Sequence, residues 1–255
     1  MKAVVVFPIY RIQLSEFELH SLKQAYSLLC SHSLVVIKPK SLNLAKLKEE
    51  YPLLSFESFD DHFFHGRKGY NKLMLSPHFY ERFLMYDYIL IHQLDAYVFR
   101  DELLYWCEKG YDYIGAPWLR KRIYHFPIIS FIRNMIHYYK IKKGKHSSQQ
   151  FYNKVGNGGF SLRKVKSHHE FLIKYNDKVQ KALSNKNNHF CHEDIFLSME
   201  IPEFHIPTAI EALNFAFDKY PSYCFSLTNK KLPFGCHAWF HHKRKKFWKS
   251  IIKLS

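Results

Sequence analysis

The sequence predicts an α/β protein with a mixed, mostly parallel central sheet and helices on both faces. The first observation is that apolar segments alternate with segments of helical periodicity in the first hundred residues. The second is that these apolar segments are nearly continuous, which is typical of strands buried on both faces of a parallel sheet. The third is size: 255 residues that are 47% hydrophobic suffice for one substantial core and exclude disordered, collagen-like and low-complexity proteins.

The first half of the chain is expected to contribute the parallel part of the sheet. Apolar runs predict strands at residues 2–9, 33–37, 53–59 and 88–92. Helical spacing predicts helices at residues 15–30, 42–50 and 71–85. Ser15 is a candidate N-cap for the first helix, and Pro77 is expected to interrupt the last because proline has no N–H to donate. The absence of GxGxxG and GxxxxGK[ST] motifs argues against dinucleotide-binding and P-loop proteins.

The second half is organised around a long basic segment, residues 119–154. We expect a short helix at 103–107, a strand at 111–114, a helix at 128–139 inside the basic segment, a helix ending near 183 and another beginning within 191–198. A segment of this length without clear periodicity is usually functional or mobile. We therefore expect one domain over residues 1–240, with 119–154 as an insertion, followed by a tail over 241–255.

The charge of the chain is concentrated in two stretches. Lys and Arg number 38 against 22 Asp and Glu, a formal net charge of +16. Residues 119–154 hold nine Lys or Arg and no acid, and residues 219–255 also hold no acid. Such charge favours a nucleic acid, an anionic membrane or a phosphorylated small molecule as partner. The sequence has no zinc-finger, RNP-like or Gly-rich KH motif, so we expect no nucleic-acid partner.

The tail, residues 241–255, combines cations with apolar side chains. On a helix, one side would carry Phe247, Trp248, Ile251 and Ile252, together with Leu254 or Ser255. This pattern is typical of a basic amphipathic helix on an anionic bilayer. The alternative is a solvated run of charges from which a few residues dock on the core.

The cysteines and the N-terminus bear on location. The five cysteines are widely spaced and contain no CxxC pair, which argues against a disulfide framework and a zinc knuckle. The N-terminal apolar run contains Pro8 and ends at Arg11 without a small-residue cleavage site, so we interpret it as a strand and not as a signal peptide. We expect a cytoplasmic protein, peripheral on the inner membrane if the tail binds lipid.

Two segments carry candidate ligand-binding residues. Asp95 follows the buried strand at 88–92, where a carboxylate can hold a ribose hydroxyl or a metal; the alternative is a turn or helix-cap residue. Residues 156–159 (GNGG) hold three glycines around Asn157 and would let the backbone approach a ligand closely; the alternative is a tight turn between two strands.

Two further segments carry candidate catalytic residues. Glu193 and Asp194 follow His192 at the start of a predicted helix, where neighbouring carboxylates can supply a general base. The alternative is an acidic helix N-terminus that complements the helix dipole. His237, between Gly235-Cys236 and Trp239, is a candidate metal ligand or phosphate contact, or else a packed or solvated histidine.

The order of these segments resembles a known family. YNKLMLSPHFY, YILIHQLDAYVF, GYDYIGAPW, VGNGGFSLRK, HEDIFLS and LPFGCHAW occur in this order between about residues 2 and 239. They are similar to the bacterial family called domain of unknown function 5672, which is grouped with GT-A-like glycosyltransferases and associated with surface polysaccharide such as capsule or lipopolysaccharide. The resemblance implies a GT-A-like fold and transfer of a sugar from a nucleotide sugar to a saccharide or lipid-linked saccharide.

The resemblance also implies roles for single residues. The Asp-x-Asp motif of GT-A enzymes corresponds here to Asp95, Ala96 and Tyr97, so the second acid is missing and metal dependence is in doubt. Asp95 and His237 could still hold Mn²⁺ or Mg²⁺ with diphosphate oxygens and water. Alternatively, cations neutralise the leaving diphosphate, and four are available: Arg120, Lys121, Arg122 and Arg163.

The resulting hypothesis is a single displacement at the anomeric carbon, with inversion favoured. Asp194, or Glu193, deprotonates the acceptor hydroxyl, and Trp118 stacks on the acceptor sugar. The donor is bound by Asp95, Asn157, Gly158, Gly159 and Arg163. The rival hypothesis is a non-catalytic module on the same fold that binds a nucleotide sugar or glycan.

Overall fold

A six-stranded sheet forms the centre of the protein. The structure is a computed structural model that describes residues 1–145, 147–184 and 189–254. The strand order is β3-β2-β1-β4-β7-β6. The strands are β1 (Ala3–Pro8), β2 (Ser33–Pro39), β3 (Leu54–Phe59), β4 (Tyr88–His92), β6 (Tyr113–Gly115) and β7 (Phe160–Lys164). β1 to β4 pair in parallel, whereas β7 is antiparallel to β4 and β6, which confirms a mixed, mostly parallel sheet.

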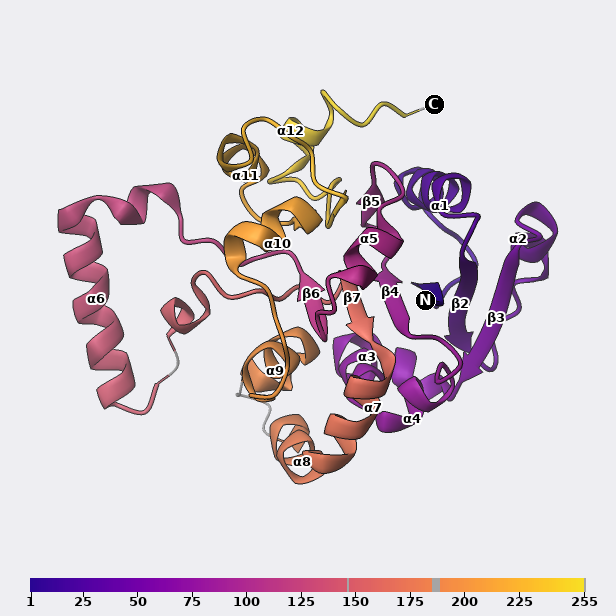
Figure 1. The fold of residues 1–255 in the computed structure, drawn as a ribbon, viewed down its shortest axis with the longest axis horizontal. Coiled ribbons are helices and arrows are strands. Elements are labelled where there is room, and N and C mark those ends of the chain that lie inside the picture. The colour runs from indigo at the N-terminus through magenta and orange to yellow at the C-terminus, as the bar shows by residue number, and fades with distance from the viewer. Residues whose placement is uncertain (146, 185–188, 255) are drawn as a thin grey trace.

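Helices cover both faces of this sheet, as predicted (Figure 1). Side chains alternate along a strand, so Val5 and Phe7 of β1 enter one apolar core while Val4 and Val6 enter the other. The first core includes residues of α1 (Glu16–Leu28), α5 (Leu103–Glu108) and α10 (Ala209–Phe215). The second includes residues of α3 (Gly66–Met74), α4 (Pro77–Glu81), α7 (Val165–Lys174), α8 (Asn176–Ser184) and α9 (Glu193–Met199).

Local signals explain where two of these helices begin. Ser15 caps α1 in a reciprocal box, because its hydroxyl accepts from the N–H of Glu18 while the Glu18 carboxylate accepts from the N–H of Ser15. The helix predicted at 71–85 is interrupted at Pro77, as expected: Pro77 takes the first turn of a separate helix, α4, where its missing N–H is not needed. α3 begins five residues earlier than predicted, at Gly66.

A second, three-stranded sheet was not predicted. It consists of β5 (Tyr97–Val98), β9 (Gly235–Cys236) and β8 (Ala216–Phe217), in that order. Each strand has two residues, which is too short for hydrophobic alternation to be visible in the sequence. This sheet nevertheless joins three distant parts of the chain beside the end of β4.

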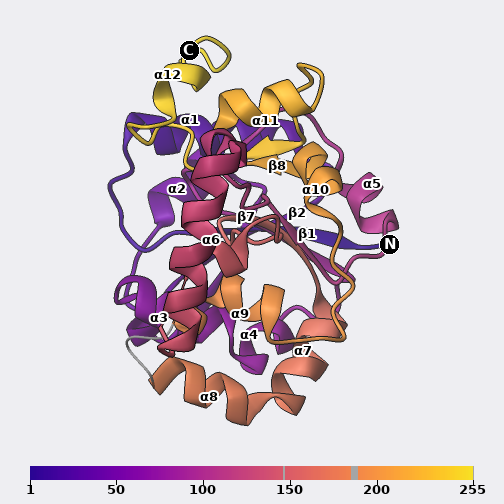
Figure 2. The ribbon, with the colours of Figure 1, turned by 90° about the vertical axis from the view of Figure 1, so that its left-hand side faces the viewer.

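The basic insertion and the tail differ in how they contact the body. The predicted helix at 128–139 is α6 (Pro127–Lys142), which stands apart at the left edge of the molecule in Figure 1 and faces the viewer in Figure 2. The tail forms only the short α12 (Lys245–Trp248) instead of a long amphipathic helix. Trp248 and Ile252 are buried in an apolar cluster with Phe217, as the docked alternative expected, so they do not present an apolar face to solvent. Ser255 lies outside the described residues.

The remaining helices are α2 (Ala45–Glu50) and α11 (Pro221–Leu227), with 3-10 turns at Asp61–Phe64, Arg122–His125, Ser148–Phe151 and His189–Cys191. Within the described parts of the chain, none of the helices has the length and apolar content needed to cross a membrane.

Candidate active site

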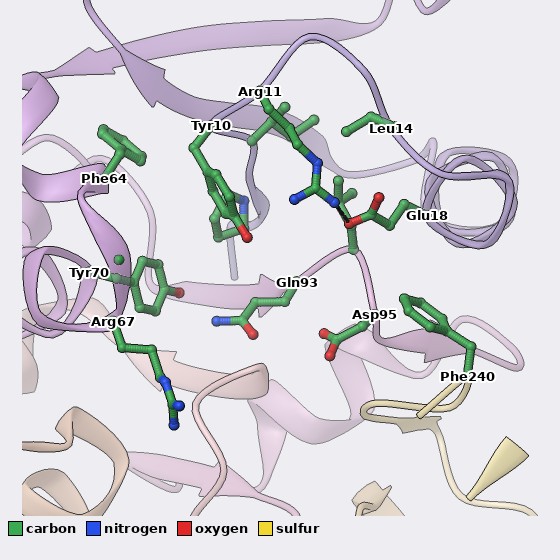
Figure 3. Close-up of a pocket in the computed structure, with 14 residues that line it drawn as sticks. Tyr10, Arg11, Leu14, Glu18, Phe64, Arg67, Tyr70, Gln93, Asp95 and Phe240 are labelled. Atoms are coloured by element: carbon green, nitrogen blue, oxygen red, sulfur yellow. Dashed lines mark hydrogen bonds and ion pairs between the residues drawn. The ribbon is translucent and has the colours of Figure 1, made fainter. Parts of the chain in front are cut away.

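Two adjoining cavities open at the carboxyl ends of β1 and β4. In the sheet, β2 lies on one side of β1 and β4 lies on the other, so the order in which the chain adds strands reverses between β1 and β4. Ligands of open α/β sheets bind beyond the carboxyl ends of the strands at such a reversal. The first cavity, of about 560 Å³, is lined by residues after β1 and after β4, including Tyr10, Leu94 and Asp95. Figure 3 shows Tyr10, Tyr70 and Gln93 around one space, with Asp95 at its edge.

The second cavity, of about 970 Å³, continues from the first. Arg67, Tyr70 and Gln93 line both. Among the residues predicted from the sequence, Asp95 lines the first cavity. The second is lined by Trp118, Lys121, Asn157, Gly158, Glu193, Asp194 and His237. Gly159 is in the lining as well, so the four separate motifs meet at one continuous cleft.

The small second sheet builds an acid–histidine cluster at the junction of the cavities. Cys236 of β9 pairs with Tyr97 and with Phe217, so the residues flanking these positions converge: Asp95, Asp218 and His237. His237 Nε2 lies 3.2 Å from Asp95 Oδ1, and its Nδ1 lies 3.5 Å from Asp218 Oδ1. Arg244 from the tail contacts Asp218 at 3.0 Å. We call Asp95, Asp218 and His237 the junction cluster.

The charges of the junction cluster reinforce one another. Burial lowers the pKa of His237, but the Asp95 carboxylate and the contact with Asp218 outweigh it and raise that pKa to about 10. Burial likewise raises the pKa of Asp95, and the His237 charge more than reverses this, so the pKa of Asp95 falls below its usual value. At neutral pH the cluster therefore holds an imidazolium between two carboxylates.

The glycine segment approaches this cluster closely. Asn157 has a φ of 68°, a left-handed conformation that asparagine tolerates, and its Oδ1 accepts from the N–H of Gly159 at 3.0 Å. A Cβ on Gly159 would lie 2.2 Å from His237 Nε2, and one on Gly158 would lie 1.5 Å from Glu193 Oε1. The segment thus turns at Gly158 and Gly159 before β7, as the alternative expected, and it also approaches both His237 and Glu193 closely.

Glu193 and Arg163 form a buried pair beneath the second cavity. Arg163 Nη2 lies 3.0 Å from Glu193 Oε2, and the side chains are 0% and 5% exposed. Arg163 also donates to the Tyr80 hydroxyl and to Ser161 Oγ. The sequence predicted that Arg163 binds the donor, but its guanidinium is fully buried and its donors are used inside the protein. Arg163 instead holds Glu193.

The two neighbouring acids of α9 differ in environment. Burial raises the pKa of Glu193 to about 7, although the Arg163 guanidinium opposes the shift. Asp194 is only half-buried and lines the second cavity. Burial raises the pKa of Asp194 as well, partly offset by the Ile195 N–H, which donates to Asp194 Oδ1 at 2.9 Å. The site makes both acids more basic, but Asp194 is the more exposed of the two and is not held in an ion pair with Arg163, so we take Asp194 as the candidate base.

Trp118 lines the second cavity together with these acids. It is half-buried, its ring packs edge-on against Phe151 at 5.8 Å, and a Cβ on Gly156 would lie 2.0 Å from it. Gly156 therefore makes room for the indole. An aromatic ring partly open to a polar cavity is suited to stacking on a sugar.

The cations of the cleft are largely different from the predicted ones. Lys121 lines the second cavity, whereas Arg120 donates to Ser130 Oγ and, like Arg122, is not part of that lining. Four cations that the sequence analysis did not single out also line it: Arg67, Arg133, Lys140 and Lys219. No local motif marks them. The only signals were the acid-free runs, 119–154 for Arg133 and Lys140 and 219–255 for Lys219.

The junction cluster is the part of the cleft that fits a divalent cation. Among the residues the structure describes, no group of three or more His, Cys, Asp or Glu is placed to hold a metal ion. Asp95 and His237 are nevertheless adjacent, and His237 Nε2 is buried without a well-formed hydrogen bond. Two protein ligands suit an ion that takes its other ligands from phosphates and water.

The fold is that of GT-A glycosyltransferases. An active-site mutant of LgtC superposes with a TM-score of 0.56 at 15% identity, covering 92% of this chain and 86% of that one. The apo-form glycosyltransferase GlyE of Streptococcus pneumoniae TIGR4 gives 0.53 at 14% identity, over 100% of this chain and 61% of that one. The bifunctional glycosyltransferase WbbM gives 0.55 at 12% identity, with 92% of this chain matching 45% of that one.

Within that fold class the chain belongs to the family described as "Protein of unknown function (DUF5672)", whose pattern it matches over residues 53–237, well over half of its length. No curated protein matches the sequence.

Proposed function

We propose that the protein is a glycosyltransferase that moves a sugar from a nucleotide-sugar donor to a hydroxyl of a saccharide or lipid-linked saccharide, in bacterial surface polysaccharide synthesis. The observation that carries the proposal is the continuous cleft, in which a cavity at the switch point of the sheet joins a second cavity that holds Asp194. The catalytic unit is residues 1–240, with 119–154 as its insertion and 241–255 as a tail whose Trp248 and Ile252 pack against it.

The first cavity would take the nucleotide. Its volume of about 560 Å³ is within the range of small-molecule sites, and Tyr10 and Phe64 offer aromatic surface for a base. The diphosphate would then lie at the junction cluster, within reach of Arg67. The donor sugar would extend past Asn157, Gly158 and Gly159 into the second cavity, where Trp118 stacks on the acceptor.

The reaction would be a single displacement at the anomeric carbon. Asp194 takes the proton of the acceptor hydroxyl, the hydroxyl oxygen forms the new glycosidic bond, and the bond to the diphosphate oxygen breaks. Asp95 orients the donor, and the protonated His237 and the cleft cations offset the charge on the leaving diphosphate. A Mn²⁺ or Mg²⁺ ion would be an alternative source of that positive charge: Asp95 and the neutral form of His237 would hold it, and the ion would take the place of the imidazolium proton. Glu193 and Arg163 act as positioning residues for the start of α9.

One observation favours the rival, a non-catalytic module that binds a nucleotide sugar or glycan. Tyr97 replaces the second acid of the Asp-x-Asp motif, and its side chain is buried among aromatic rings instead of facing the cleft. The two functions differ in turnover. Incubation with UDP, GDP, CMP and dTDP sugars, with and without an acceptor, should reveal slow donor hydrolysis that an acceptor accelerates. Binding without turnover of any of these donors would support the module instead.

A further inference from the structure

Helix α6 carries its apolar side outward, the reverse of an ordinary surface helix. Its polar side is turned to the body: Ser130, Arg133 and His137 are half-buried. The opposite side carries an apolar stripe at i, i+3, i+4, i+7 and i+11 spacing: Ile128, Phe131, Ile132, Met135 and Tyr139. All five are exposed, Ile128 by 76% and Phe131 by 68%, and no residue of α6 is buried.

Specific contacts hold α6 in this orientation. Arg120 donates to Ser130 Oγ at 2.9 Å, and Arg133 donates to the Tyr152 hydroxyl at 2.8 Å. The Arg133 guanidinium also lies 3.8 Å from the centre of the Tyr124 ring. These contacts use the polar side of the helix, so the apolar stripe is left facing away from the protein, as the isolated position of α6 in Figure 1 illustrates.

The charges around the stripe indicate what it contacts. Exposed cations stand at both ends: Lys121 and Arg122 before α6, and Lys142, Lys143 and Lys145 at its end. No acid occurs in residues 119–154. A second copy of this chain would therefore bring like charge against like charge, whereas an anionic bilayer supplies both apolar depth and opposite charge.

We propose that α6 lies in the interface of an anionic membrane, with Ile128, Phe131, Ile132, Met135 and Tyr139 among the acyl chains and the flanking cations at the headgroups. This replaces the tail as the expected membrane contact, because Trp248 and Ile252 of the tail are buried in the protein. Interfacial helices with an apolar face and basic flanks bind in this way.

The membrane surface would lie beside the cleft. Arg133 and Lys140 of α6 line the second cavity, so the helix separates that cavity from the bilayer by its own width only. An acceptor carried on a lipid could then reach Asp194 without leaving the membrane. This last step rests on the proposed function, whereas the membrane contact itself does not.

The experiment is co-sedimentation of the full chain with vesicles of phosphatidylcholine alone or of phosphatidylcholine mixed equally with phosphatidylglycerol. We expect binding to the mixed vesicles and at least tenfold weaker binding of the I128S/F131S variant, because two large side chains lose their apolar burial. The matched control is L84S/M85S, which changes two exposed apolar residues away from α6 and should bind like the wild type.

Three results would overturn the proposal. The first is wild-type binding by I128S/F131S, and the second is equal binding to both vesicle types. The third is a dimer in light scattering, without vesicles, that I128S/F131S converts to a monomer. Loss of vesicle binding in K243Q/K246Q/K249Q but not in I128S/F131S would show that the tail, and not α6, contacts the membrane. Donor hydrolysis by I128S/F131S should equal that of the wild type, so a failed transferase assay and a failed membrane assay remain distinguishable.

Discussion

Two charged clusters border the same cleft, and they differ in what surrounds them. Arg163 and Glu193 are closed off, with side chains 0% and 5% exposed and their partners inside the protein. His237 and Asp95 are 19% and 33% exposed and line the cavities. The first pair fixes structure, because every charge is matched internally. The junction cluster can exchange its internal contacts for those of a ligand. Burial, more than residue type, separates a positioning pair from a binding site.

The largest effect is expected when the buried pair is broken. Arg163→Met should lower the free energy of unfolding by about 3–5 kcal/mol at pH values where Glu193 is ionised in the folded state, because Glu193 is then left as an unpaired buried charge. The folded-state pKa of Glu193 is already above its usual value, so the folded state prefers the protonated acid. That preference is lost as pH rises toward and through the folded pKa.

Arg163 lowers the folded-state pKa of Glu193, so its removal raises that pKa above the present value of about 7, and the loss caused by Arg163→Met should grow as the pH rises above about 7. Urea unfolding at several pH values measures it. A loss of unfolding free energy that is small or independent of pH would show that Arg163 does not stabilise the fold by pairing with the Glu193 carboxylate.

The junction cluster should instead respond to ligand. Two protein groups hold a divalent cation weakly, so Mn²⁺ alone should hardly change the melting temperature. Mn²⁺ with a nucleoside diphosphate should raise it more than the nucleotide with EDTA, and saturation near 100 times the dissociation constant corresponds to about 2.7 kcal/mol. If the nucleotide shifts the melting temperature equally with Mn²⁺ and with EDTA, the basic side chains of the cleft, and not a metal ion, neutralise the diphosphate.

Substitutions at two adjacent glycines test the difference between the buried pair and the junction cluster most directly. A methyl group at Gly158 meets Glu193, and one at Gly159 meets His237. Gly158→Ala should lower stability by about 1–3 kcal/mol, since the buried pair has little room to shift. Gly159→Ala should cost less stability but weaken nucleotide binding, because His237 can move only into the cleft. Thermal unfolding and nucleotide titration of both variants test this, and the reverse pattern would contradict the comparison.

The sequence predicted most of the fold and only part of the site. Continuous apolar runs located β1 to β4, and Ser15 located the start of α1, because these signals are local. Asp218 was missed because it reaches His237 only through strands of two residues. Arg163 was misassigned for a related reason: a positively charged residue in a ligand-like motif does not reveal that its partner, Glu193, lies thirty residues further on.

The orientation of α6 also could not be predicted from the sequence. A helix was predicted from the periodicity, but the apolar side of a helix is ordinarily assumed to face the core. Only the contacts of Arg133 and Ser130 show that the polar side faces inward. The tail shows the converse, since Trp248 looked available to a membrane and is buried by the second sheet and its neighbours.

The central claim is that the cleft transfers sugar with Asp194 as base, and Asp194→Asn tests it most directly. With the donor that the wild type turns over, this variant should lose about 10²-fold or more of its transfer rate. The melting-temperature shift caused by that donor should persist. Asp177→Asn, on the exposed start of α8, is the matched control and should keep full activity. Full transfer activity in Asp194→Asn would contradict the account.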